Sequence, residues 1–95
     1  MNIRTKSGFE CQVRPETLSD FRFLRQLRDM KGSDPTQNIV GMVDMAEMVL
    51  GEDGVERLLE HVKTEEGFAP AERVAAEVGE IISIMAEASK PVKNC

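Results

Sequence analysis

The sequence predicts a mainly α-helical protein, a small cluster of about four helices with a β-hairpin at its N-terminus. Three observations favour this fold: apolar residues recur at helical spacing, proline and capping residues precede several of these stretches, and a short alternating segment surrounds a glycine. We expect one domain over residues 1–95, with the hairpin in residues 1–14, the helical cluster in residues 16–90 and a flexible tail in residues 91–95.

The first segment predicts a hairpin with a three-residue loop, Lys6-Ser7-Gly8. This loop length gathers the apolar side chains on one face, whereas a two-residue loop would place Arg4 opposite Cys11. The expected pairs are Thr5–Phe9, Ile3–Cys11 and Met1–Val13 on the apolar face, with Arg4–Glu10 on the other.

The first helix is expected after Pro15, with Thr17 as its N-cap and Asp20 as the acid of a capping box. It should end at Lys31-Gly32-Ser33. At 100° per residue one broad arc is apolar and the opposite arc is polar. The apolar arc holds Phe21, Phe23, Leu24, Leu27 and Met30, and the polar arc holds Arg22, Arg25, Gln26 and Asp29.

The second helix has the clearest start signal, with Asp34 as N-cap, Pro35 at the first helical position and Gln37 closing a capping box. It should run to Leu50 and stop at Gly51. This helix is apolar nearly all round, which is typical of a helix that is buried on several sides or binds a partner.

A capping box of Asp53 and Glu56 predicts a short third helix, and Pro70 predicts the start of a fourth. The third helix should place Val55, Leu58, Leu59 and Val62 inward. The fourth has an inner stripe of Ala71, Val74, Val78, Ile81, Ile82, Met85 and Ala88, with Glu72, Glu80, Ser83 and Glu87 facing outward.

Charge excludes one class of function. The chain has 12 basic and 17 acidic residues, for a net charge of −5, which excludes a uniformly basic nucleic-acid-binding protein. The distribution is uneven, because residues 1–31 carry a net +3 and residues 32–95 a net −8. Without an apolar run long enough to span a membrane, or a signal peptide, we expect a cytoplasmic protein that does not bind membranes.

We predict no catalytic residue, no metal site and no cofactor. The two cysteines form no metal-binding spacing, so Cys11 is interpreted as a small core residue and Cys95 as a thiol in the tail. The only imidazole, His61, follows Glu60 on the outer flank of its helix and is interpreted as a solvated surface residue.

Two sets of residues are candidates for protein binding. Met42, Met45 and Met48 recur every third residue and cannot all face one core stripe, so Met45 and Met48 could line a binding groove with Ile84, or could fill gaps in the core. On the first helix, Arg22 and Arg25, with Arg28, could bind an acidic partner. They could equally form a solvated face with an Arg25–Asp29 pair.

Several short motifs carry a resemblance to a known family. Ser7-Gly8-Phe9-Glu10 begins the match, and Lys93-Asn94 near the end completes it. Between them the matching residues are Leu18, Asp20, Leu24, Leu27, Leu50-Gly51, Leu59, Glu60-His61, Glu65-Glu66-Gly67 and Pro70. In these residues the chain resembles the small tail assembly chaperones of long-tailed phages and prophages of Gram-positive bacteria.

The resemblance implies a non-enzymatic protein in the host cytoplasm that is absent from the mature virion. Such proteins bind the tape measure protein and help to recruit tail tube subunits, often beside a frameshifted longer form of themselves. Two alternatives remain open: an acidic phage-encoded inhibitor of a host nucleic-acid-binding protein, using Glu72, Glu77, Glu80 and Glu87, or a small regulator whose basic first helix binds DNA.

Overall fold

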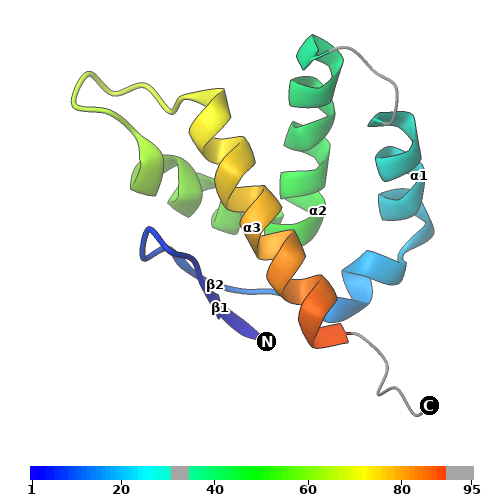
Figure 1. Ribbon diagram of the computed structural model, residues 1–95. Coiled ribbons are helices and arrows are strands. Elements are labelled where there is room, and N and C mark those ends of the chain that lie inside the picture. Colours follow the sequence, from blue (N-terminus) through cyan, green and yellow to red (C-terminus); the bar gives the residue numbers. More distant parts are fainter. Residues whose placement is uncertain (31–34, 90–95) are drawn as a thin grey trace.

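The computed structural model describes the backbone of residues 1–30 and 35–89, and within the second range the side chains of residues 39–88. In chain order it contains strands β1 (Asn2–Arg4) and β2 (Glu10–Gln12), the 3₁₀ helix η1 (Pro15–Ser19), and the α-helices α1 (Phe21–Met30), α2 (Pro35–Val62) and α3 (Ala71–Ser89) (Figure 1). Most of the described residues lie in helices, so the mainly α-helical prediction is confirmed.

The predicted hairpin register is also confirmed. β1 and β2 are antiparallel, with Ile3 opposite Cys11 and Arg4 opposite Glu10. The outer pair forms a weak ion pair, with 3.8 Å between Arg4 Nε and Glu10 Oε2. Gly8 has φ +95°, a left-handed value that the three-residue loop requires. The inner face of the hairpin is buried, and its members are Ile3, Thr5, Phe9, Cys11 and Val13.

The prediction of four helices is wrong, because the second and third expected helices form the single helix α2. Gly51, with φ 75° and ψ 169°, is non-helical, and α2 consists of two helical segments that meet there at a kink (Figure 1). The second segment begins immediately after Gly51, so Asp53 and Glu56 lie in its first turns and not at the start of a separate helix. Across the described residues there are therefore three α-helices.

The start of α1 also differs from the prediction. Residues Pro15–Ser19 form η1, and Asp20, not Thr17, caps α1. The Asp20 carboxylate accepts a 2.8 Å hydrogen bond from the Arg22 N–H, and the Asp20 carbonyl accepts one of 3.0 Å from the Leu24 N–H. The expected end of this helix at residues 31–33, the Asp34 cap and the tail with Cys95 lie outside the described residues.

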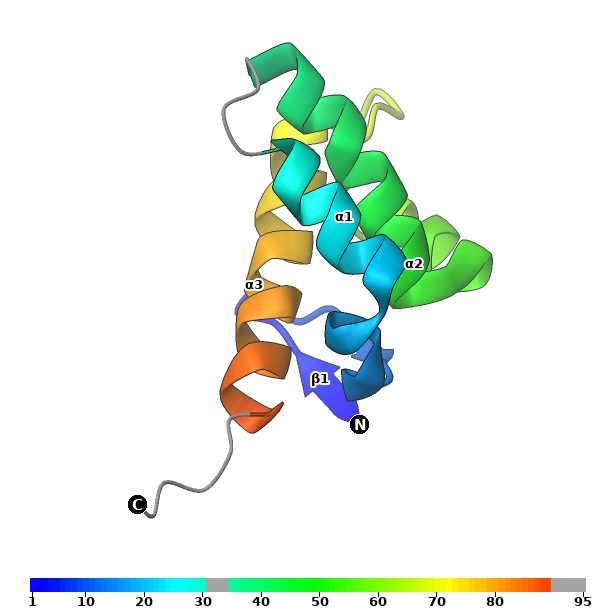
Figure 2. The same cartoon turned by 90° about the vertical axis from the view of Figure 1, so that its right-hand side faces the viewer.

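The core lies where α3 crosses both halves of α2 and the inner face of the hairpin closes the remaining side (Figure 1). α1 packs on the first half of α2 and on η1, at the side of the molecule that faces the viewer in Figure 2. Besides the hairpin residues the core contains Phe23, Met45, Ala46, Val49, Leu58, Val62, Val78, Ile81 and Met85.

Candidate protein-binding surface

Of the three apolar residues predicted to line a binding groove, one is buried and two are half-buried. Met45 is 2% exposed and belongs to the core, so it is excluded as an exposed contact. Met48 and Ile84 are half-buried and pack against the same core. Position 45 lies on the inner side of α2 with the buried residues Ala46 and Val49, and this explains its burial.

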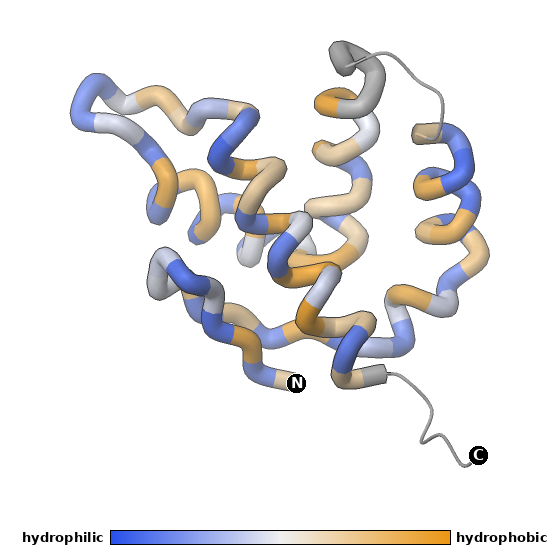
Figure 3. The backbone as a smooth tube through the Cα atoms, viewed as in Figure 1, coloured by the Kyte–Doolittle hydropathy of each residue, from blue (hydrophilic) through white to orange (hydrophobic). Residues whose placement is uncertain are grey.

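The exposed apolar residues lie instead on α1. Phe21, Leu24 and Leu27 are 73%, 46% and 45% exposed, and Phe23 is the only residue of α1 that is fully buried. The predicted apolar arc therefore exists, but α2 and η1 cover only part of it. Figure 3 shows apolar segments along α1 although this helix lies at the edge of the molecule.

The first half of α2 also exposes apolar side chains. Ile39, Val40 and Val43 are between 43% and 62% exposed. These residues belong to the stretch that is apolar nearly all round, and the structure covers only one side of it. α1 and the first half of α2 pack against each other, and together they carry six exposed large apolar side chains.

We call these six residues the α1–α2 apolar surface: Phe21, Leu24, Leu27, Ile39, Val40 and Val43. Exposed large apolar side chains mark a partner-binding site where they form a contiguous patch, and these six residues are the candidates for such a patch on α1 and α2. On α1 they recur every third residue, and on α2 Val43 follows Val40 by three positions and Ile39 by four, which suits contact with an amphipathic helix of a partner.

The arginines of α1 have nearby interaction partners. Arg22 forms a 3.3 Å ion pair with Asp20, and Arg28 forms one of 2.8 Å with Asp29. The side-chain hydrogen bond between Arg22 and Asp20 lowers the pKa of Asp20 and raises that of Arg22. The Arg25 guanidinium lies 5.8 Å from the centre of the Phe21 ring.

Three of the predicted binding residues do come together, in an open cleft of about 640 Å³ between α1 and α2. Arg22, Arg25 and Met48 line it, together with the acids Asp44 and Glu47 of α2. The cleft carries both signs of charge, so it lacks the uniformly basic character of a nucleic-acid site.

One cluster has no counterpart in the sequence-based predictions. Ser7 at the hairpin tip has its Oγ 2.9 Å from His61 Nε2 and 2.7 Å from Glu77 Oε2, and the Lys6 N–H donates to Glu80 Oε2 at 2.8 Å. His61 is exposed as predicted, but it is not simply solvated. The hairpin tip and its partners lie more than 50 positions apart in the chain, and no local pattern indicates their contact.

The hydrogen-bond donors in this cluster indicate that it holds the hairpin tip against α2 and α3. Ser7 donates its single hydroxyl proton to Glu77, so His61 Nε2 must supply the proton in its own contact with Ser7. An imidazole in that role cannot act as the base that activates a hydroxyl. Glu77 and Glu80 therefore form hydrogen bonds with the hairpin. These two carboxylates belong to the acidic face of α3 that an inhibitor of a nucleic-acid-binding protein would use, so that face is not made of four solvent-directed acids.

No metal site or membrane-spanning helix is present in the described part of the chain. Within residues 1–30 and 35–89 no group of three or more His, Cys, Asp or Glu side chains is arranged to hold a metal ion. Over the same ranges, no helix combines the length and apolar character needed to cross a membrane. Comparison with known protein families, with curated protein sequences and with solved structures finds no match to this chain.

Proposed function

We propose that this protein is a non-enzymatic tail assembly chaperone of a long-tailed phage or prophage. It binds the tape measure protein transiently in the host cytoplasm, helps to recruit tail tube subunits and is absent from the mature virion. A frameshifted longer form of the chain is a further proposed partner. The resemblance of the sequence motifs suggests this function, and the exposure of the α1–α2 apolar surface is the structural observation that supports it.

The chemistry of the surface fits a client with an apolar helical stripe. Six side chains that are about half exposed would each contribute roughly 1 kcal/mol when a partner covers them, because full burial of such a side chain contributes about 1.5–3 kcal/mol. The sum is comparable to the loss of rotational and translational freedom on association, about 4–15 kcal/mol. Binding by one such surface is therefore weak and reversible, as a holding protein requires.

Co-expression with the tape measure protein tests this proposal. We expect the wild-type chain to keep that protein in the soluble fraction. A Leu24→Asp/Leu27→Asp variant should lose most of this effect, because two charges would replace two exposed contacts while the buried Phe23 remains in place.

The matched control is Ser83→Asp/Ala86→Asp, which adds the same two charges at exposed positions of α3. Far-ultraviolet circular dichroism verifies that both variants are folded. If the folded Leu24→Asp/Leu27→Asp variant keeps the tape measure protein as soluble as the control does, the α1–α2 apolar surface is not the binding surface. If the wild-type chain has no effect either, the proposed function itself is wrong.

A further inference from the structure

Two turns in this protein share one sequence pattern and one geometry. Residues 5–9 and 64–68 both read Thr-x-x-Gly-Phe. In each turn the threonine N–H donates to the phenylalanine carbonyl (2.9 and 2.7 Å), and the glycine N–H donates to the threonine carbonyl (2.9 Å in both). The phenylalanine N–H donates to the threonine hydroxyl (3.2 and 3.3 Å), and the glycines, Gly8 and Gly67, have φ of 95° and 93°.

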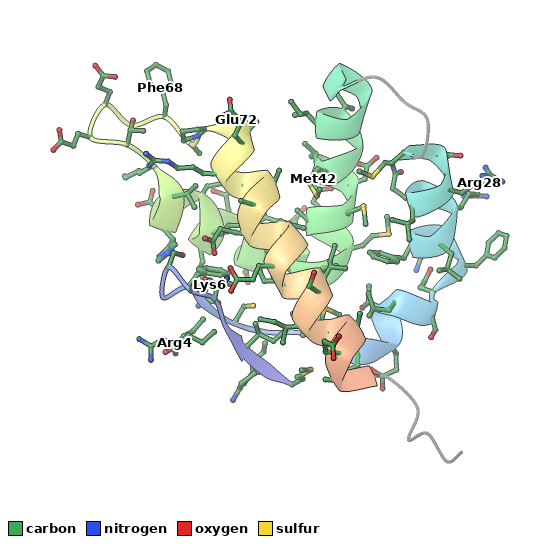
Figure 4. The ribbon with its side chains drawn as sticks, in the orientation of Figure 1. Arg4, Lys6, Arg28, Met42, Phe68 and Glu72 are labelled. Carbon is green, nitrogen blue, oxygen red and sulfur yellow. The ribbon has the colours of Figure 1, made fainter. Side chains whose placement is uncertain are left out.

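The phenylalanines of the two turns have opposite surroundings. Phe9 is 3% exposed, with the Arg57 guanidinium 5.5 Å from its ring centre and the His61 ring 5.4 Å away. Phe68 is 68% exposed and projects from the loop between α2 and α3 (Figure 4). The first turn therefore shows, inside this protein, what kind of site accepts a phenylalanine presented in this way.

The tip of the first turn meets hydrogen-bond acceptors. At the two positions before the glycine, the Lys6 backbone N–H donates to the Glu80 carboxylate and the Ser7 hydroxyl donates to the Glu77 carboxylate. A tip with hydrogen-bond donors is thus matched by acceptors on the surface that receives it.

The second turn carries the opposite chemistry at the same positions. Glu65 and Glu66 are exposed, and neither has an ion-pair partner among the described residues. The base of the loop is held by Arg73, whose Nη1 donates to the Val62 carbonyl at 3.3 Å. A fixed turn of this kind loses little conformational entropy on binding.

We propose that residues 64–68 form a docking element that inserts Phe68 into an apolar site on a basic protein segment. By analogy with the first turn, the site offers an arginine or lysine against the ring. The charges of Glu65 and Glu66 favour further cations beside it. The partner is a cationic amphipathic segment of another protein. This docking element is separate from the α1–α2 apolar surface, and Figure 4 shows Phe68 far from Arg28 of α1.

A synthetic amphipathic helix of leucine and arginine, about four turns long and containing one tryptophan, is a suitable probe. The chain has no Trp or Tyr, so the fluorescence of that tryptophan reports binding alone. We expect Phe68→Ser to weaken binding of the probe at least tenfold, since aromatic anchors dominate such contacts. Glu65→Lys/Glu66→Lys should weaken it to a similar degree, and added salt should reduce wild-type binding.

The charge variant has a matched control, Glu52→Lys/Glu56→Lys, which makes the same change in charge at exposed positions of α2. This control should bind the probe like the wild-type chain, and a probe with glutamate in place of arginine should not bind. Probe binding by Phe68→Ser as tight as that of the wild-type chain, or equal weakening by Glu65→Lys/Glu66→Lys and by Glu52→Lys/Glu56→Lys, would overturn the proposal. So would sedimentation showing self-association that Phe68→Ser abolishes, because the occupant would then be a second copy of the chain.

Discussion

The bend at Gly51 predicts how three glycine-to-alanine substitutions should differ. With φ 75° and ψ 169°, Gly51 lies in a region that is nearly restricted to glycine, so Gly51→Ala adds about 1–3 kcal/mol of strain. Straightening α2 would avoid the strain, but it would remove Leu58 and Val62 from the core, at about 1.5–3 kcal/mol for each side chain. The strained but bent helix is therefore the lower-energy outcome.

The other two glycines calibrate the measurement. A Cβ at Gly54 would lie 2.8 Å from Leu50 Cβ, so Gly54→Ala should also destabilise the protein. A Cβ at Gly79 of α3 would meet no atom of another residue's side chain or of another element within 4 Å. Gly79→Ala should therefore stabilise the protein by about 0.5–1 kcal/mol through helix propensity.

Thermal unfolding followed by circular dichroism at 222 nm measures all three variants. For a domain of this size each kcal/mol shifts Tm by about 4–8 °C, so Gly51→Ala should lower Tm by roughly 4–24 °C while Gly79→Ala raises it by several degrees. A Gly51→Ala variant as stable as the wild-type protein would refute the reasoning. The bend would then not be needed to bring both halves of α2 to one core.

Three further outcomes follow from burial and charge. Ile81→Ala should lower the free energy of unfolding in urea by about 2–4 kcal/mol, because Ile81 is fully buried, whereas Ile84→Ala at a half-buried site should cost distinctly less. Burial raises the pKa of the Cys11 thiol. In a variant that lacks Cys95, a thiol reagent at pH 8 should therefore react with Cys11 only as fast as the protein opens. Rapid reaction in the native state would contradict the burial of Cys11. The hydrogen bond from Arg22 lowers the pKa of Asp20 below 3.8 in the folded protein. The contribution of Asp20 to the free energy of unfolding is therefore complete above pH 3.8 and is lost as the pH falls through the lower folded-state pKa. Asp20→Ala should remove this part of the acid dependence in urea titrations at pH 2–5, and an unchanged profile would count against the cap.

The hairpin could be predicted completely because local rules leave it one solution. Only a three-residue loop places all the apolar side chains on one face, and only a glycine fits the left-handed position that this loop contains. The paired residues Ile3 and Cys11 and the left-handed Gly8 agree with both rules.

The helices were predicted less well because periodicity states which side chains share a face but not what covers that face. Phe21 and Leu24 belong to the expected arc and yet remain exposed, since no element of the described structure packs over that side of α1. Gly51 provided a correct signal for a break in helical geometry. The sequence had no signal to distinguish a bend from an end, because that depends on whether the next turn finds a core to join.

The candidate surfaces depended most on tertiary structure. Periodicity alone could not show that Met45 lies on the inner side of α2, where it is buried. It also could not show that Leu24 and Leu27 of α1 are exposed. The contact between Ser7 and His61 joins residues 54 positions apart in the chain and could not be found by any local pattern.

The two surfaces inferred for this protein differ in chemistry, and that difference bears on how they could act together. At α1, Arg22 and Arg28 are each paired with a neighbouring acid, which leaves apolar area as the main property that a partner could recognise. At residues 64–68 the exposed ring stands beside two acids that have no ion pair among the described residues. A segment that suits the first surface needs an apolar stripe, whereas one that suits the second also needs positive charge. Because the two surfaces lie on different helices and loops, one partner need not displace the other. Single variants at Leu24 and Phe68 should therefore have separable effects.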